Sequence, residues 1–352
     1  MNTARFHGAR VSLWGAITVL VAAMCLLLPS ASAQGYTRKT VNCDPAVPAD
    51  YHKIQDALNN FNWIGMLEIE VTGTCAGRIN IGDGTFAYNS VWIHPPAGQR
   101  AAISPATPTG NVIQIGGAHG VLIERLDISG GNNGVMVYDS SEADFFDVTI
   151  ENNTNTGVGA GGNSIVYFAS SRIRNNGMVG VDVSIQGANT VYLRGGQDTP
   201  DPTIIEGNGR WGVDAGTLGV AWFDGYNIVR NNGGATTATT HGGIHAARNS
   251  TVQVLSNAKG ATEITGNVGP GILAEVNSSV SLLGANIHSN TEQGVRARTM
   301  SVVELLGQNT FASHGMDNIS CDVWSLVTGD FTGINLKSID CKNADLPPQH
   351  RK

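Results

Sequence analysis

Two aspartates and a histidine occupy the same place in three copies of a short motif. Asp182, Asp214 and His245 each lie two residues after a glycine that is followed by valine or isoleucine. Two neighbouring carboxyl groups split their pKa values, so one stays protonated while the other ionises. Such a pair can cleave a glycosidic bond, and a nearby histidine can tune it or relay a proton. We assign these three residues as candidate catalytic groups.

Other side chains on or near these strands are suited to holding a sugar. Arg296 and Arg298 could grip a sugar carboxylate. Trp211 and Trp222 could stack on sugar rings, and Trp211 is the better candidate because Trp222 could belong to the core. The predicted substrate-binding residues are Tyr138, Trp211, Glu275, Arg296 and Arg298.

The motif itself reads Ile/Val, two residues, Asn, three residues, Gly, then Val/Ile. Its asparagines are Asn153, Asn176, Asn208, Asn232, Asn267 and Asn290, and the copy at Asn232 carries extra residues before its glycine. Asn and Gly tolerate the left-handed backbone that sharp corners require. Because no unit has room for a crossover helix, the short strands must stack as a parallel β-helix of about ten coils. A sandwich would not keep one motif in constant register, and we expect the asparagines to form a ladder.

Alternation along the strand after each glycine predicts which side chains face outward. The first and third residues after the glycine are apolar, so the second and fourth point to solvent. The second positions are Met136, Gly159, Asp182, Asp214, His245, Leu273 and Arg296; the fourth positions are Tyr138, Gly161, Ser184, Gly216, Ala247, Glu275 and Arg298. The two aspartates then lie on adjacent coils, with their carboxyl groups about 5 to 7 Å apart.

Both ends of the solenoid are expected to be closed. Residues 48–61 predict a short amphipathic helix with Asp50 as its N-cap, which would cover the first coil. The segment from Cys321 to Cys341 breaks the repeat and would cap the other end. Disulfides Cys43–Cys75 and Cys321–Cys341 are the natural pairing in an exported chain. A metal site made of all four thiolates is the alternative, but the close spacing of zinc-binding cysteines is missing.

Residues 1–33 are predicted to be a secretory signal peptide. Arg5 and Arg10 precede an apolar run over 11–28, and Ala31-Ser32-Ala33 fits a cleavage site. A membrane anchor is the alternative, since the run is just long enough to span a bilayer. Cleavage would leave 19 of the 21 basic residues against 28 acidic ones, a net charge of −9, which disfavours nucleic acid as a partner. We expect a secreted or periplasmic monomer with no membrane contact after cleavage.

These features resemble the pectin-lyase-like superfamily of right-handed β-helix proteins. The similarity lies in residues 54–58, residues 116–121 and the Asn-x3-Gly repeats, and covers roughly 45–315. Arg296-Ala297-Arg298 looks like the Arg-x-Lys strand of polygalacturonases, and residues 241–245 faintly resemble their Gly-His-Gly. The Asn-Thr-Asp and Asp-Asp motifs of that family are absent, as are the basic partners of a pectate-lyase-like stretch at 91–94. The resemblance implies an all-β right-handed fold with active sites on this face, while the superfamily's activities are diverse.

Two functions are consistent with the sequence. The first is a secreted carbohydrate-active protein that acts by hydrolysis or lyase chemistry on an extracellular polysaccharide, for which an acidic polymer is one candidate. Insertions at 195–203 and 233–240 flank Asp214 and could form a cleft, and Asp198 with Asp201 could bind Ca²⁺; no other cofactor is expected. The second is a non-catalytic polysaccharide-binding protein, scaffold or adhesin. The predicted parts are the signal peptide 1–33, an N-terminal cap and first coil 34–80, repeats 81–315, and a C-terminal cap and tail 316–352.

Overall fold

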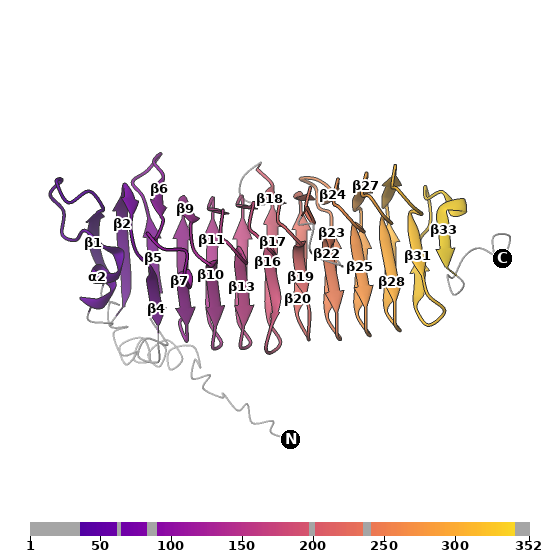
Figure 1. Ribbon diagram of the computed structural model, residues 1–352, viewed down its shortest axis with the longest axis horizontal. Helices are drawn as coiled ribbons and strands as arrows, with labels where there is room; N and C mark the ends of the chain where they lie inside the picture. Colours follow the sequence, from indigo (N-terminus) through magenta and orange to yellow (C-terminus); the bar gives the residue numbers. More distant parts are fainter. Residues whose placement is uncertain (1–35, 62–64, 83–89, 197–200, 235–240, 342–352) are drawn as a thin grey trace, which may run out of the picture.

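The computed structural model describes residues 36–61, 65–82, 90–196, 201–234 and 241–341 (Figure 1). These residues wind into one long solenoid in which each turn contributes short strands to three parallel sheets. The predicted right-handed parallel β-helix is confirmed. The predicted signal peptide lies outside the described residues, among which no helix is long and apolar enough to span a membrane.

The three sheets run side by side along the axis. Sheet A contains 12 strands: β1 (Tyr36–Asn42), β2 (Met66–Thr72), β5 (Ser90–His94), β8 (Val121–Glu124), β11 (Glu142–Phe146), β14 (Ile165–Ala169), β17 (Thr190–Gly195), β20 (Val220–Gly225), β23 (Thr251–Leu255), β26 (Ser279–Leu283), β29 (Val302–Gly307) and β32 (Leu326–Gly329). Sheet B contains 10: β3 (Thr74–Cys75), β6 (Ala101–Ile103), β9 (Leu126–Ser129), β12 (Thr149–Glu151), β15 (Arg172–Arg174), β18 (Thr203–Glu206), β21 (Asn227–Arg230), β24 (Glu263–Thr265), β27 (Asn286–His288) and β30 (Thr310–Ala312). Sheet C contains 11: β4 (Ile79–Gly82), β7 (Asn111–Gly116), β10 (Asn133–Tyr138), β13 (Val158–Gly161), β16 (Val181–Ile185), β19 (Trp211–Ala215), β22 (Gly242–Ala247), β25 (Ile272–Glu275), β28 (Val295–Arg298), β31 (Ile319–Cys321) and β33 (Ile339–Cys341).

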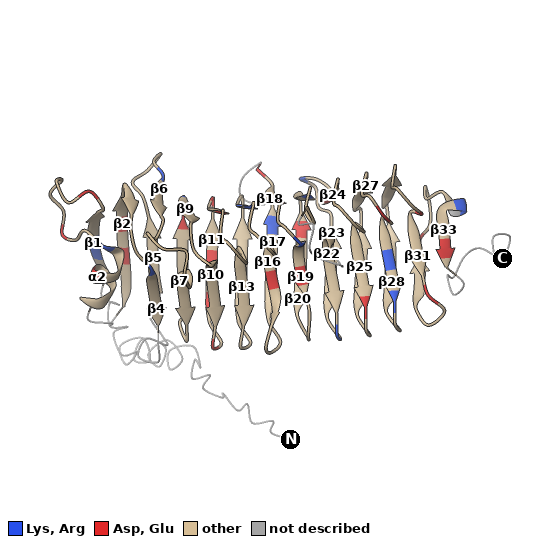
Figure 2. Ribbon diagram, viewed as in Figure 1, with Lys and Arg blue, Asp and Glu red and all other residues tan. Residues whose placement is uncertain are grey.

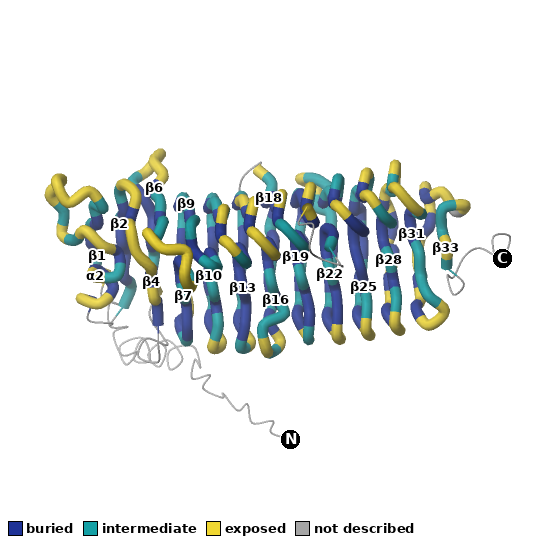
Figure 3. The backbone as a smooth tube through the Cα atoms, in the orientation of Figure 1, coloured by how far each residue is buried: buried dark blue, intermediate teal, exposed yellow. Residues whose placement is uncertain are grey.

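One hydrophobic core runs along the inside of the solenoid. Strand residues alternate between buried and partly exposed positions, and the exposed positions gather at the turns (Figure 3). Val181, Val213 and Ile244 stack in register on successive strands of sheet C and are fully buried. This stacking of β-branched side chains turns the residue after each of them outward.

The predicted asparagine ladder is confirmed. The Asn176 Oδ1 accepts hydrogen bonds from the Asn153 backbone N–H (3.2 Å) and Nδ2 (3.0 Å). Its Nδ2 in turn donates to the Asn208 Oδ1 (3.0 Å) and the Ile150 carbonyl (3.3 Å). The same pattern continues through Asn232 and Asn267 to Asn290, and every member is buried. Each amide therefore satisfies its donors and acceptors inside the protein.

The physical reason for the Asn and Gly of the motif differs from the predicted one. The left-handed residue is the one before each ladder asparagine, as at Asn152 (φ 55°) and Asn175 (φ 54°). The repeat glycine is instead required by close approach, because a Cβ at Gly180 would lie 2.7 Å from the Asn208 Nδ2. Asn is thus selected by its amide and Gly by its lack of a side chain.

The N-terminal cap is a helix shorter than predicted. α2 (Ile54–Asn59) buries Ile54, Ala57 and Leu58 against the first coil, but its N-cap is Lys53. Asp50 instead accepts hydrogen bonds from the Thr40 backbone N–H and hydroxyl, both at 2.9 Å. The assignment of Asp50 as N-cap is therefore wrong, because its carboxylate is hydrogen-bonded to Thr40 of β1 and not to the helix.

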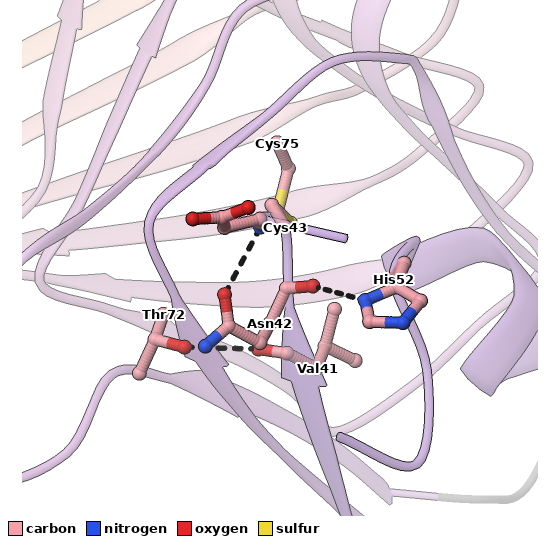
Figure 4. The surroundings of a disulfide bond; sticks show 7 residues. Val41, Asn42, Cys43, His52, Thr72 and Cys75 are labelled. Atoms are coloured by element: carbon pink, nitrogen blue, oxygen red, sulfur yellow. Dashed lines mark hydrogen bonds between the residues drawn. A yellow bond between two sulfur atoms is a disulfide. The ribbon is translucent and has the colours of Figure 1, made fainter. Parts of the chain in front are cut away.

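Both predicted disulfides are present. The Cα atoms are 4.9 Å apart in Cys43–Cys75 and 4.7 Å apart in Cys321–Cys341, within the range that disulfides span. The first bond ties the end of β1 to β3, next to a hydrogen bond between His52 Nδ1 and the Asn42 carbonyl (Figure 4). The second joins the last two strands of sheet C, β31 and β33.

The ladder ends where the repeat places a histidine instead of an asparagine. A Cβ at Gly294 would lie 2.6 Å from the His314 Nε2, the place that the next asparagine amide takes in earlier coils. Both ring nitrogens of His314 are buried, and neither makes a hydrogen bond of normal geometry within the described part of the chain, although the Ile287 backbone lies close to the ring. We predict that His314→Asn extends the ladder and raises the free energy of unfolding by about 1 kcal/mol, measured by urea denaturation. His119→Asn, at an exposed turn, serves as the control and should change nothing; a destabilised His314→Asn would contradict the prediction.

Candidate functional site

The predicted outward row on sheet C is present. Cα pairing runs from Met136 through Gly159 to Asp182, Asp214, His245, Leu273 and Arg296 on seven successive strands. Figure 2 shows acidic positions on β16 and β19 and basic positions on β28 of the same sheet. Asp182 and Asp214 are register partners on adjacent coils, as predicted.

His245 is clamped between two carboxylates. Its Nδ1 lies 2.9 Å from the Asp214 Oδ1, and its Nε2 lies 3.0 Å from the Glu275 Oε1. The histidine side chain is only 12% exposed. A neutral imidazole can donate from one nitrogen alone, so two carboxylate partners favour the doubly protonated ring. The sequence placed all three residues on this face but did not predict that Glu275 reaches back to His245.

The charges of this group alternate from coil to coil. Burial opposes charging of His245, but hydrogen bonds to Asp214 and Glu275 outweigh it and raise the pKa of the imidazole. The hydrogen bond from His245, helped by Arg298, lowers the pKa of Glu275 to about 2. Arg298 approaches the Glu275 Oε2 with its Nε at 2.6 Å. Glu275 and Arg298 thus neutralise each other, and neither has the free charge expected of a substrate-binding group.

Asp182 has a different environment from its neighbour. Its Oδ1 accepts hydrogen bonds from the Ser184 backbone N–H (2.9 Å) and hydroxyl (2.5 Å). Burial and the adjacent charge of Asp214 outweigh those bonds and raise the pKa of Asp182. A β-bulge lies beside it, because Gly161 pairs with Ile185 instead of Ser184. This bulge, which the sequence did not reveal, turns Ser184 back onto the aspartate.

Trp211 is fully buried, so the prediction that its ring stacks on a sugar is wrong. Its side chain has no exposed surface, and its ring stacks on the His245 ring at 4.7 Å with an interplanar angle of 12°. It packs in a small apolar cluster with Val179 and Leu273, outside the main core. Trp211 therefore shields the histidine from water and strengthens its ion pairs.

Arg296 is the more accessible of the two predicted arginines. It lies 3.6 Å from Glu292, and both side chains are over one third exposed. A cavity of about 110 Å³ lies here, lined by Trp211, His241, Pro270, Leu273, Glu292, Arg296 and Arg298. Arg296 can therefore reach a ligand at the sheet surface.

The other residues predicted to bind the substrate or Ca²⁺ do not lie beside the two aspartates in the described structure. Tyr138, on β10, is two coils from Asp182 and accepts a hydrogen bond from Gln114. Trp222 is not in the core. It is half-buried on the outer face of sheet A, and its ring packs against the Tyr192 ring at a tilt. Asp198 and most of the two insertions lie outside the described residues, within which no cluster of three potential metal ligands occurs.

Comparisons with known proteins address the fold. The family model for a right handed beta helix region matches residues 47–195. The comparison with curated proteins found no match.

Solved structures of the same architecture have low sequence identity to this chain. The enzymatically active domain of tailspike protein 2 from bacteriophage CBA120 aligns with a TM-score of 0.60 at 14% identity, over 86% of this chain and 51% of that one. Pectate lyase Pel9A aligns with a TM-score of 0.53 at 11% identity, over 89% and 80%. ORF18 of Geobacillus virus E2 aligns with a TM-score of 0.52 at 12% identity, over 95% and 67%. The chain spans about half the length of the tailspike domain, and these likenesses establish the fold alone.

The clamp on His245 predicts a pH dependence of stability. Because folding raises the pKa of His245 above 6.5, its ion pairs stabilise the protein below that pH and are lost as pH rises through the folded-state pKa. We expect the free energy of unfolding of the wild type to exceed that of His245→Gln by more at about pH 5.5 than at about pH 9. Urea denaturation at both pH values measures this, with His119→Gln as the control. A pH-independent difference would show that the histidine is not charged by folding.

Proposed function

We propose that this chain is an exported enzyme that cleaves an extracellular polysaccharide at the outer face of sheet C. The observation that carries the proposal is the pair Asp182 and Asp214, adjacent in register but in unlike environments. Burial raises the pKa of Asp182, whereas Asp214 is held by His245. Unequal carboxyl groups side by side are what general acid–base cleavage of a glycoside needs.

The residues divide the reaction between them. Asp182, in its protonated form, donates its proton to the glycosidic oxygen as the bond to the leaving sugar breaks. Asp214 takes a proton from the attacking water, so that a hydroxyl is added to the other sugar and both sugars leave intact. His245 orients the Asp214 carboxylate, and Arg296 lies three coils from Asp214 along the same row, where it can contact a neighbouring sugar.

Two further observations support an extracellular polysaccharide substrate. The two disulfides favour an oxidising compartment, which agrees with the predicted signal peptide. One structure with this fold is a pectate lyase, and another is an enzymatically active tailspike domain. Elimination chemistry remains the second route, since a lyase would use the same base without adding water.

A non-catalytic scaffold or adhesin is the competing function, and one observation favours it. The series Asp214, His245, Glu275 and Arg298 is paired internally, as expected for charges that stabilise a stack of coils. In that case the same face would bind a polysaccharide without cleaving it.

Substitution of the aspartates distinguishes the two functions. We expect Asp182→Asn and Asp214→Asn each to lower the cleavage rate about 100-fold or more, because each removes a proton-transfer group. The rate is measured as new reducing ends on a panel of neutral and uronate-containing polysaccharides. Ultraviolet-absorbing unsaturated ends in the same samples would indicate elimination instead of hydrolysis.

The matched control is Asp144→Asn on sheet A. Burial raises the pKa of Asp144 as it does that of Asp182, but Asp144 lies on a different sheet. We expect full activity from this variant. Full activity in both sheet C variants, or no cleavage of any polymer by the wild type, would favour the scaffold function.

A further inference from the structure

The outer face of sheet B holds a second polar cleft, separate from the row on sheet C. Its volume is about 350 Å³, within the range of small-molecule pockets. The lining comes from β12 and β15, from Asp127 of β9, and from turns beside them. Val148 is its one aliphatic side chain among the described residues, so the cleft offers ligands mainly charge and hydrogen bonds.

Most charges in the cleft are already paired. Arg100 reaches the Asp127 Oδ1 with its Nη2 and the Asp147 Oδ1 with its Nη1, both at 2.8 Å. Arg174 donates from its Nε to the Glu151 Oε2 at 2.7 Å. These charge-assisted hydrogen bonds hold two guanidinium groups and three carboxylates in fixed positions along the walls of the cleft.

Arg172 is the exception. It is exposed, lines the cleft, and makes no ion pair with any residue of the described chain. Strand geometry places it on the same side of β15 as Arg174, about 6.6 Å along the strand. Its register partner on β12 is Thr149, whose hydroxyl also lines the cleft. Arg172 thus has no ion-pair partner among the described residues and stands beside hydroxyl and carboxylate groups, in a cleft whose three arginines and three carboxylates balance.

We propose that this cleft binds an acidic saccharide, with its carboxylate on Arg172. The carboxylates and hydroxyls of the walls accept and donate hydrogen bonds to sugar hydroxyls, and the near absence of apolar lining disfavours peptides and nucleobases. The inference goes beyond the proposed function, because the cleft lies on a different sheet and needs no catalysis. A long acidic polymer held here and on sheet C would bind more tightly through two contacts than through one.

The test is titration calorimetry of the full chain with oligogalacturonate. Arg296→Gln is included as background in every variant, so that binding at sheet C contributes least. We expect Arg172→Gln to weaken binding about tenfold, the loss typical of one charge-assisted hydrogen bond. Arg248→Gln removes the same charge from an exposed turn and should leave the affinity unchanged. Thermal unfolding of each variant checks that the fold is intact.

Three results would overturn the proposal. Unchanged binding by Arg172→Gln would place the ligand elsewhere, and equal losses in Arg172→Gln and Arg248→Gln would mean non-specific charge attraction. Equally tight binding of polyglutamate would mean that the cleft recognises an acidic peptide. A carboxyl-reduced, neutral oligosaccharide should bind the background variant and Arg172→Gln equally weakly. Asp182→Asn is also included in the background so that the oligosaccharide is not cleaved during the titration, and a failure of the proposed enzyme activity would then leave this result standing.

Discussion

The buried carboxamides that stack from coil to coil set the register on which the rest of the structure depends. Each amide from Asn176 to Asn267 accepts from the coil before and donates to the coil after. A slip of one residue would leave buried amide groups unpaired, at about 1–3 kcal/mol each, and would turn the outward side chains into the core. The ladder therefore holds Asp182, Asp214 and His245 in one row, although they are 32 and 31 residues apart in sequence.

That register imposes a condition on every charged row. Neighbouring outward side chains on adjacent coils are about 4.8 Å apart at the backbone, so like charges repel and opposite charges pair. Asp214 and His245 are register partners of opposite sign, and so are Glu275 and Arg298 two positions further along the strands; His245 joins the two pairs by reaching diagonally to Glu275. Asp182 violates it, since its neighbour in the row is another carboxylate. The protein accommodates this with two hydrogen bonds from Ser184 and a raised pKa, which is the pattern expected where charge placement serves a reaction.

The sequence predicted the features that follow from period and alternation. The spacing of the ladder asparagines located the coils, and alternation after each glycine located the outward row, because both depend only on strand geometry. Contacts that depend on side-chain direction could not be predicted from the sequence pattern. The reach of Glu275 to His245, the bulge that turns Ser184 toward Asp182, and the burial of Trp211 involve rotamers and neighbouring coils. The motif also does not say which residue takes the left-handed conformation, since Asn152 and Asn153 are identical in type and differ only in backbone.

Sheet B provides a comparison, because it carries a row of charged side chains that are all paired with the opposite charge. There Glu151, Arg174, Glu206 and Arg230 are register partners on four successive coils, and they alternate in sign throughout. Arg174 and Arg230 each lie 2.7 Å from a glutamate. The row on sheet C differs in two ways that stabilisation does not require. It uses a titratable histidine where sheet B uses arginine, and it sets a second carboxylate beside the first. A stack selected for stability alone would have no reason to keep Asp182 next to Asp214, so this departure from alternation is the strongest physical argument that the row on sheet C performs chemistry.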